Sequence, residues 1–225
     1  MRFDILTLFP DMVTSVLSES IIGRAAQKGI IKFKAHNIRD YSEDKHRRVD
    51  DTPYGGGMGM LMAAPPIFSC YKAVAGEEKA EKTRVIYMSP QGKVLTQSKA
   101  KELSQYDRLI ILCGHYEGVD ERIIEEIVDE EISAGDYVLT GGELPACILV
   151  DCVSRLIDGV LPSDDCHEIE SISCGMLEYP QYTRPVVFNG KSVPEVLQNG
   201  NHKEIEKWRY SQSLERTKKK RPDLI

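Results

Sequence analysis

The sequence predicts an α/β fold, in which a parallel sheet is flanked by helices, followed by a small all-helical C-terminal domain. Through the first 160 residues, strand-like apolar runs alternate with stretches of helical periodicity, which is the pattern of βαβ units. Towards the C-terminus the helical signals continue without such runs. With 225 residues, the chain is long enough for one large domain and a small appendage.

Short apolar runs mark the expected strands. In chain order they are Phe3–Phe9, Ile31–Ile38, Val85–Ser89, Leu109–Cys113 and Glu131–Ala134. Between the last two, Glu121–Glu130 carries isoleucines on one face and carboxylates on the other, which predicts a surface helix. Leu144–Leu156 predicts a more buried helix, which a glycine at 159 helps to end.

The chain is expected to divide into three parts. Residues 1–160 form the α/β domain, residues 161–173 a flexible linker without periodicity, and residues 174–225 the small domain. In the small domain, Pro194–Leu197 predicts a short helix. Asn201, with Glu204 three residues later, predicts the capped start of another.

Composition favours a soluble protein of the cytoplasm. Hydrophobic residues make up 41% and charged residues 28% of the chain, and no apolar run reaches the roughly 18 residues that a membrane span needs. Met1–Leu8 has the pattern of a strand, so neither a signal peptide nor a membrane partner is expected. The six cysteines form no C-x-x-C pair, which is typical of reduced thiols. A zinc site at Cys166, His167 and Cys174 is rejected on spacing, so no metal site is predicted.

Charge is unevenly distributed along the chain. The net charge is −6, which argues against attraction of nucleic acid to the whole surface. Residues 121–180 are strongly acidic, whereas residues 201–225 carry eight Lys or Arg against four carboxylates. Either this basic end meets a polyanion as a local patch, or it is only a solvated tail.

Two glycine-rich loops follow strands and are expected to share one pocket. The first is 114–118, after the strand Leu109–Cys113, and the second is 134–143. They are either plain turns or walls for a flat heterocycle, because glycine lets the main chain approach a ligand closely. The glycine run 55–59 does not match a dinucleotide fingerprint, and Gly92-Lys93-Val94 lacks the rest of a P-loop. A nucleoside without phosphates, such as S-adenosylmethionine, is therefore weakly favoured.

A long polar loop, residues 40–54, carries clustered cations at positions 45–48. Loops of this length inside compact domains are usually functional or disordered. Its cations either grip phosphates or belong to a solvated turn, and the residues alone leave both interpretations open.

A series of short motifs occurs along the whole chain in the order and spacing of one family. They are Leu8-Phe9-Pro10, Gly23-Arg24-Ala25, His46-Arg47 with Val49-Asp50-Asp51, Pro53-Tyr54-Gly55-Gly56-Gly57, Ser89-Pro90-Gln91-Gly92, Gly114 with Tyr116-Glu117-Gly118, Gly135-Asp136-Tyr137-Val138-Leu139, Gly141-Gly142-Glu143-Leu144-Pro145, Tyr182-Thr183-Arg184-Pro185 and Gly200-Asn201-His202. The chain thus resembles the bacterial tRNA (guanine-N1)-methyltransferases of the SPOUT superfamily. Two positions depart from the family: Met58 replaces a frequent proline, and Arg48 a frequent small polar residue.

The resemblance implies a deep trefoil knot in the C-terminal half of the α/β domain, a homodimer, and an S-adenosylmethionine pocket at the knot. The implied cofactor-binding residues are Tyr87, Met88, Ser89, Pro90, Gly114, Tyr116, Glu117, Ser133, Ala134, Gly135, Asp136, Tyr137, Val138, Leu139, Gly141 and Gly142. The implied tRNA contacts are Lys45, His46, Arg47 and Asp50, together with the basic C-terminal end. Whether Mg²⁺ is also needed stays open.

The substrate implied by the resemblance is tRNA, methylated at N1 of the guanine just 3′ of the anticodon when another guanine precedes it. Two residues are expected to act on this base: Glu170 as general base and Arg155 as the cation that stabilises charge on O6. The family usually has aspartate at the first position, and Glu168 and Asp165 are nearby alternatives. The linker is expected to order when tRNA binds and to bring Glu170 to the cofactor of a neighbouring subunit.

Two rival functions remain. The first is a non-catalytic RNA-binding protein on the same scaffold, which would have no reason to keep the glycine loops beside an arginine and a carboxylate. The second is a nicotinamide-dependent oxidoreductase, which the missing phosphate fingerprint disfavours.

Overall fold

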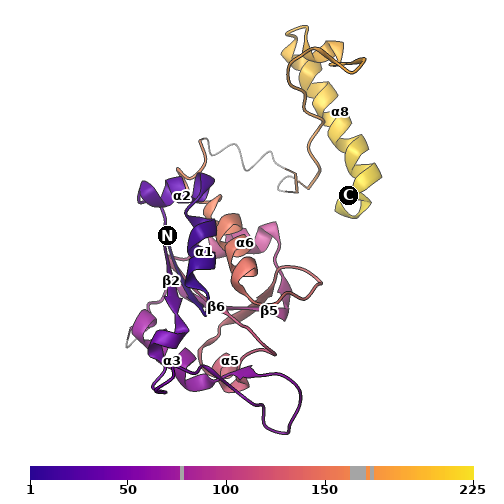
Figure 1. Cartoon of the computed structure of the whole chain (residues 1–225). Helices are drawn as coiled ribbons and strands as arrows, with labels where there is room; N and C mark the ends of the chain where they lie inside the picture. Colours follow the sequence, from indigo (N-terminus) through magenta and orange to yellow (C-terminus); the bar gives the residue numbers. More distant parts are fainter. Residues whose placement is uncertain (77–78, 163–170, 173–174) are drawn as a thin grey trace. The chain divides into compact units, whose positions relative to one another are not determined.

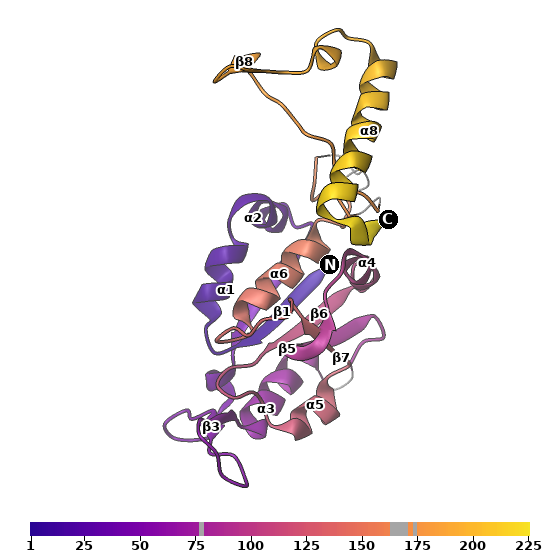
Figure 2. The same cartoon turned by 90° about the vertical axis from the view of Figure 1, so that its right-hand side faces the viewer.

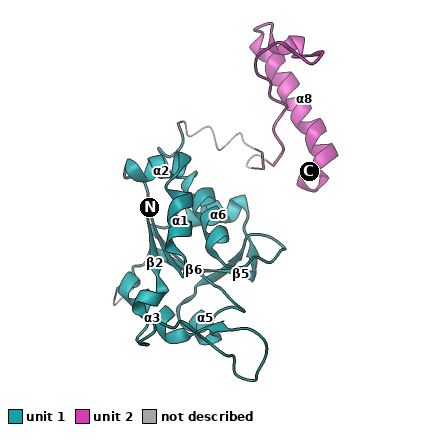
Figure 3. Cartoon of the chain, in the orientation of Figure 1, with its two compact units in different colours: residues 1–161 teal, residues 162–225 magenta. Residues whose placement is uncertain are grey.

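The computed structural model describes two compact units, residues 1–161 and residues 162–225 (Figure 3). The residues that it describes are 1–76, 79–162, 171–172 and 175–225. Unit 1 is the α/β domain, and unit 2 contains the C-terminal helix. In the described part of the chain, no helix is both long and apolar enough to cross a membrane.

The sheet of unit 1 is parallel and five-stranded, with the order β2-β1-β6-β5-β7 (Figure 1). Its strands are β1 Arg2–Thr7, β2 Lys32–Asn37, β5 Thr83–Val94, β6 Arg108–Cys113 and β7 Glu130–Ser133. The predicted parallel sheet flanked by helices is therefore confirmed. β6 is inserted between β1 and β5, so that Ile111 pairs with Ile5 on one side and Ile86 on the other.

Helices cover both faces of this sheet, as the turned view shows (Figure 2). Alternate residues of β6 enter different cores: Ile111 packs in one cluster and Ile110 in the other. The first face is covered by α1 Pro10–Leu17, α2 Ser20–Gln27, α4 Gln97–Leu103 and α6 Glu143–Ser154. The second is covered by η1 Ile38–Tyr41, α3 Ala64–Ala75 and α5 Glu121–Ile127. Burial on both faces explains why the strands are almost continuously apolar.

β5 extends beyond the predicted end at Ser89 and pairs with β7 a second time. The register shifts between Met88 and Lys93, both of which pair with Ile132. A Cβ at Gly92 would collide with the backbone of Glu131 and Ile132. Glycine at this position therefore permits the close approach of the two strands.

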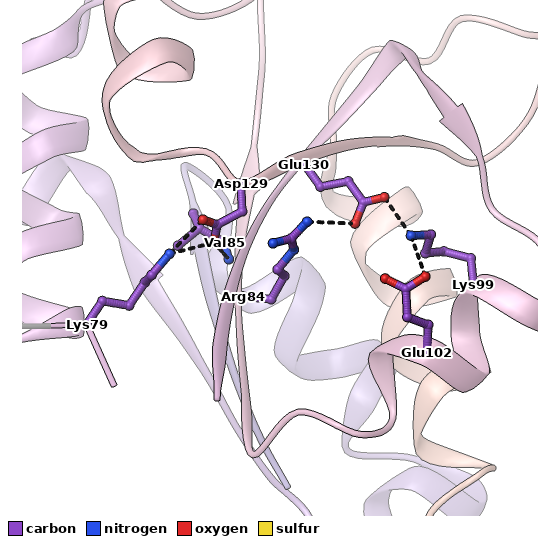
Figure 4. Close-up of polar contacts among 7 residues, drawn as sticks. All are labelled: Lys79, Arg84, Val85, Lys99, Glu102, Asp129 and Glu130. Atoms are coloured by element: carbon purple, nitrogen blue, oxygen red, sulfur yellow. Dashed lines mark hydrogen bonds and ion pairs between the residues drawn. The ribbon is translucent and has the colours of Figure 1, made fainter. Parts of the chain in front are cut away.

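The β5–β7 edge is held by partly exposed ionic contacts (Figure 4). The Asp129 carboxylate accepts a hydrogen bond of 2.7 Å from the backbone N–H of Val85, at the start of β5. It also pairs with Lys79 at 2.6 Å. Asp129 thus fixes the entry of β7 against its neighbour.

A second ionic group lies on the other side of the same strands (Figure 4). Glu130 lies 2.8 Å from the Lys99 ammonium of α4 and 3.7 Å from the Arg84 guanidinium of β5. Lys99 also pairs with Glu102 at 2.8 Å. These contacts join β5, β7 and α4, and Glu130 is the residue that links all three.

Asp4 of β1 is a fully buried carboxylate surrounded by cationic groups. It lies 2.8 Å from the His36 ring nitrogen, 2.8 Å from the Arg108 guanidinium and 2.7 Å from that of Arg2. Burial alone would raise the pKa of Asp4, but hydrogen bonds from His36 and Arg2 and the charge of Arg108 outweigh it. The pKa of Asp4 is lowered to about 2. The carboxylate therefore joins β1, β2 and β6 at one end of the sheet.

Four of the six cysteines lie in the described part of the chain. Cys70, Cys113, Cys147 and Cys152 are free. Burial raises the pKa of Cys70 to about 12 and that of Cys147 to about 11. These thiols stay protonated at neutral pH and serve as small apolar side chains.

Unit 2 contains a long helix and a small hairpin. Its elements are β8 Val187–Phe188, β9 Lys191–Ser192, η2 Glu195–Leu197, α8 His202–Lys220 and η3 Pro222–Leu224. The prediction of an all-helical domain was therefore wrong in this detail. Asn189 and Gly190 both have positive φ, 51° and 76°, and form the tight turn of an antiparallel hairpin.

Helix α8 begins as the capping pattern predicts and is packed by polar as well as aromatic contacts. The Asn201 side chain accepts a hydrogen bond from the backbone N–H of Glu204. Thr217 is fully buried and accepts a 2.9 Å bond from the N–H of Leu177. Trp208 lies between the rings of Tyr179 and Tyr182, at 6.5 and 6.4 Å.

Candidate active site

A cavity of about 390 Å³ lies where β5, β6 and β7 end. Ligands of open α/β sheets commonly bind at the carboxyl ends of strands, so the position itself suggests a binding site. Its lining includes the predicted cofactor residues Tyr87, Met88, Ser89, Pro90, Gly114, Tyr116, Glu117, Ser133, Ala134, Tyr137, Val138, Leu139, Gly141 and Gly142. The structure therefore brings most of the predicted set together around one space.

The two glycine loops form adjoining walls of this cavity. The backbone N–H of Gly142 donates a hydrogen bond of 2.9 Å to the carbonyl of Gly114, and His115 and Gly141 form an antiparallel bridge. A Cβ at Gly142 would lie 2.8 Å from Cys113 Cα. The close contact of the two loops thus requires glycine at this position.

Gly135 and Asp136 do not line the cavity. The Ser133 hydroxyl forms two hydrogen bonds with the backbone of Gly135. It accepts from the Gly135 N–H at 3.1 Å and donates to the Gly135 carbonyl at 2.9 Å. A Cβ at Gly135 would lie 2.5 Å from the Tyr137 ring, which does line the cavity. Gly135 therefore shapes the wall through its neighbours, and Asp136 is exposed.

The hydroxyl of Tyr87 is a neutral donor inside the cavity. Burial, with smaller effects from Glu131 and Glu121, raises the pKa of Tyr87 to about 12. Its oxygen would lie 2.8 Å from a Cβ at Gly114, so the ring is packed directly against the first glycine loop. At neutral pH this group can donate a hydrogen bond and cannot act as a base.

Sequence reasoning missed a buried carboxylate behind the second loop. Glu143, in the first turn of α6, is almost fully buried and accepts a hydrogen bond of 2.7 Å from the Thr7 hydroxyl. That hydroxyl accepts in turn from the N–H of Phe9 at 2.9 Å. A carboxylate at this end of a helix is favoured by the helix dipole. The hydrogen bond between Thr7 and Glu143 connects the end of β1 to the cavity wall. Because the two residues lie far apart in the sequence, the motif that contains Glu143 could not indicate this contact.

Arg155, one of the two predicted catalytic residues, does not line this cavity. Arg155, at the end of α6, lines a different cavity of about 170 Å³ with Cys147, Asp151 and residues of α1 and α2. Glu170 lies outside the described residues, as do the alternatives Glu168 and Asp165. The rejected zinc candidates Cys166, His167 and Cys174 also lie outside them.

The predicted tRNA contacts lie on and beside the loop that precedes β3, Asp50–Asp51. Arg47 pairs with Asp40 at 3.2 Å, and both side chains are largely exposed. The backbone N–H of His46 donates to Asp44, and Lys45 is exposed. Asp50 begins the short strand that pairs with β4, Leu61–Met62.

No group of three or more His, Cys, Asp or Glu side chains with the geometry of a metal site occurs among the residues that the structure describes. The polar groups of the cavity are backbone groups, hydroxyls, the Gln91 amide, the His115 imidazole and the carboxylates of Glu117, Glu121 and Glu131.

Comparison with known proteins identifies the family. The family model described as tRNA (Guanine-1)-methyltransferase TrmD matches residues 1–225. A tRNA (guanine-N(1)-)-methyltransferase of Ruminiclostridium cellulolyticum is 63% identical over 225 residues, which are the whole of this chain and 96% of the relative. Proteins of the same name from Lachnospira eligens and Clostridioides difficile are 56% and 54% identical, again over the whole of this chain and over 94% and 97% of theirs. The chain therefore belongs to the tRNA (guanine-1)-methyltransferase family TrmD and is an enzyme that methylates tRNA.

Proposed function

We propose that this enzyme transfers a methyl group from S-adenosylmethionine to N1 of the guanine immediately 3′ of the tRNA anticodon, when a guanine precedes it. The observation that carries the proposal is the cavity built by the two glycine loops at the ends of β5, β6 and β7. It offers backbone groups and apolar walls, and neither the glycine run 55–59 nor Gly92-Lys93-Val94 has the spacing of a phosphate-binding loop.

The cavity suits a nucleoside sulfonium in three respects. Backbone N–H and C=O groups of the loops can read the edge of an adenine, as glycine-rich turns allow close approach. Leu139 and Ile132 supply apolar packing, and Tyr87 supplies a neutral hydroxyl. Carboxylates at the rim, including Glu117, favour the positively charged donor.

Methyl transfer to guanine N1 needs two further groups. N1 carries a proton at neutral pH, so a base must remove it while the bond to the methyl carbon forms and the bond to sulfur breaks. Loss of the proton leaves an electron pair on the guanine, which is shared between N1 and O6. A cation near O6 stabilises the charge that develops there. We assign Glu170 to the first role and Arg155 to the second, and each contributes about 10² to 10⁴ in rate.

A homodimer would reconcile the position of Arg155 with its proposed role. Arg155 lines a cavity with α1 and α2, away from the glycine loops of its own chain. The neighbouring surface of α1 and α6 exposes the apolar side chains of Met12, Val16, Leu144 and Ile148. We propose that a second copy covers this surface, so that Arg155 and Glu170 serve the cavity of the partner.

The path of the chain after β7 agrees with the trefoil knot that we propose for this unit. From β7 the chain returns past the end of β6, where Gly142 N–H bonds to the Gly114 carbonyl, and then continues into α6. α6 packs in the same core as the first strand, through residues such as Ala146 and Val150. A knot would hold both glycine loops around the donor.

We propose that tRNA is held by Lys45, His46, Arg47 and Asp50 together with the basic end of α8, and that the reaction takes place in the cytoplasm. The last turn of α8 carries Lys218, Lys219 and Lys220. An involvement of Mg²⁺ would be revealed by addition of a chelator to the assay described next. Reduced turnover after chelation, with restoration by Mg²⁺, would demonstrate it.

The decisive experiment is transfer of a labelled methyl group to tRNA transcripts. Wild-type enzyme should form N1-methylguanine in a transcript that has guanine immediately 3′ of the anticodon and another guanine before it. It should form none when the preceding guanine is replaced. Glu170→Ala and Arg155→Ala should each lose about 10² or more in kcat, while calorimetry shows unchanged binding of S-adenosylmethionine. Absence of product from wild type would refute the proposed target position, and full activity of both variants would refute the assigned roles.

Mixed dimers test the exchange of residues between subunits. Gly142→Ala is expected to damage the cavity, and Glu170→Ala removes the base. At an S-adenosylmethionine concentration too low to fill the Gly142→Ala cavity, a refolded equal mixture of the two variants should reach about a quarter of wild-type activity, because half of the dimers carry one intact site. A mixture that stays inactive although mixed dimers form would show that the base serves its own chain.

A further inference from the structure

Glu143 is a carboxylate buried directly beside the cavity of the glycine loops. It follows Gly142 in the chain, lies in the first turn of α6 and is only 3% exposed. Its Oε1 accepts the 2.7 Å hydrogen bond from the Thr7 hydroxyl. The proton of that hydroxyl is available to Glu143, because the Thr7 oxygen itself accepts from the N–H of Phe9. Glu143 is thus held in place as a hydrogen-bond acceptor.

The second carboxylate oxygen lies against Gly141, which lines the cavity. A Cβ at Gly141 would lie 2.5 Å from Glu143 Oε2. Since a Cα–Cβ bond adds about 1.5 Å, this oxygen is at most about 4 Å from the Gly141 Cα. Gly141 does not have a positive φ, so lack of space explains glycine at this position. The carboxylate therefore lies against a wall residue that has no side chain.

No cation balances this carboxylate within the described part of the chain. The ion pairs among the described residues do not include Glu143. The His115 ring also lies beside Gly141, with Cδ2 2.9 Å from the Cβ position, but among the described contacts it neither bonds nor pairs with Glu143. Burial and, to a smaller extent, the charge of Glu143 raise the pKa of Cys147 to about 11.

A buried carboxylate without a cation favours a positively charged ligand nearby. Burial removes the hydration of the charge, and the loss is offset only by hydrogen bonds or by a partner of opposite sign. Glu143 has one hydrogen bond of this kind, from Thr7. A cation bound in the cavity would therefore be attracted through the wall at Gly141, where low exposure limits screening by water.

We propose that Glu143 determines charge specificity in the cavity, and favours the sulfonium of S-adenosylmethionine over the neutral thioether of S-adenosylhomocysteine. The two ligands differ by one methyl group and one positive charge at sulfur. When the methyl carbon passes to guanine N1, its bond to sulfur breaks and the electron pair stays on sulfur, which becomes neutral. The attraction to Glu143 then ends, so the product leaves more readily. The inference rests on the proposed function, because it takes S-adenosylmethionine as the donor.

Calorimetry with three ligands tests the proposal. They are S-adenosylmethionine, S-adenosylhomocysteine and sinefungin, which carries an ammonium group in place of the methylated sulfonium. Glu143→Gln keeps the size of the side chain and an acceptor for Thr7 but removes the charge. It should weaken binding of the two cationic ligands by about tenfold or more, the effect of a unit charge roughly 8 Å away in a partly buried site. Binding of S-adenosylhomocysteine should change by less than about threefold.

Thr7→Val is the matched control, because it removes the hydrogen bond to Glu143 and leaves the charge. It should change the three affinities by one common factor, as a purely structural contact would. If Glu143→Gln does not fold, the double variant Thr7→Val with Glu143→Leu takes its place. Apolar replacement of both partners in a buried contact is tolerated better than replacement of one. The double variant should show the same selective loss.

Two results would overturn the inference. One is an equal change for all three ligands in Glu143→Gln, including no change at all. The other is a selective loss of the same size in Thr7→Val, which would assign the effect to the hydrogen bond instead of the charge. Failure of the proposed function is recognised separately. Wild-type enzyme that binds neither S-adenosylmethionine nor S-adenosylhomocysteine would refute the donor, whereas normal binding without methylation of tRNA would refute only the proposed target.

Discussion

Gly142 offers a sharp test of the cavity because alanine there meets backbone, which cannot rotate away. The backbone φ of Gly142 is −83°, a value that alanine adopts without strain. Its Cβ, however, would lie 2.8 Å from Cys113 Cα and 3.0 Å from the nitrogen of Gly114. Ordinary contact begins near 3.4 Å, so the two glycine loops must separate by about 0.6 Å.

Such a displacement affects binding more than folding. Overpacking of this kind costs about 1–3 kcal/mol of stability, which a domain of this size survives. Binding sites, by contrast, need their groups held to within about 0.5 Å, so the affinity of Gly142→Ala for S-adenosylmethionine should fall by about tenfold or more. Calorimetry measures the affinity, and thermal unfolding measures the loss of stability.

Gly29→Ala is the matched control for Gly142→Ala. Gly29 has φ of +73° and no atom within 4 Å of the position where a Cβ would be, so alanine there adds strain without a collision. It should lower stability by about 1 kcal/mol and leave binding of S-adenosylmethionine unchanged. Wild-type affinity in Gly142→Ala, or an equal loss of affinity in Gly29→Ala, would refute the reasoning.

Asp4, whose pKa is lowered from 3.8 to about 2, contributes about 2 kcal/mol of stability above pH 4 that is lost as pH falls through 2. Urea unfolding of Asp4→Asn should show a loss of about 3 kcal/mol near neutral pH and a weaker acid dependence; an unchanged acid dependence would count against the buried cluster. Glu130→Gln should cost about 1–3 kcal/mol, since Glu130 is 13% exposed and joins two cations, whereas the more exposed Glu102→Gln should cost less. Equal losses would contradict this order. Binding of tRNA should weaken steeply with salt, and Lys219→Gln should reduce the slope of log Kd against log salt by about one; an unchanged slope would remove this lysine from the interface.

The sheet could be predicted because its strands are buried on both faces. Leu109–Cys113 is continuously apolar, and the structure places its residues alternately in two cores. The extension of β5 could not be predicted, because it contains Pro90 and Gly92, which argue against a strand. The need for glycine at position 92 becomes clear only in the structure, where the backbone of β7 lies directly beside Gly92. The hairpin of unit 2 did have a local signal, Asn189-Gly190, which was missed because its strands have two residues each.

The sequence could predict which segments line the cavity where those residues are local in sequence. The glycine loops are short motifs at strand ends, and both line the cavity. The contact between Thr7 and Glu143 joins positions 136 residues apart, so no motif could indicate it. Tertiary packing also decides the surroundings of Arg155: helical periodicity placed it at the end of α6 but not beside α1 and α2.

The central position of β6 has a consequence for how the chain is made. β1 is synthesised before the other strands of the sheet, yet its partner on one side is β2 and on the other is β6, which starts at Arg108. Until β6 is synthesised, β1 and β5 have no strand between them, and the order β2-β1-β6-β5-β7 cannot be assembled. Pairing over such long separations slows folding and leaves strand edges open meanwhile. Nascent chains that stop before Arg108 should therefore be protease-sensitive and dependent on chaperones.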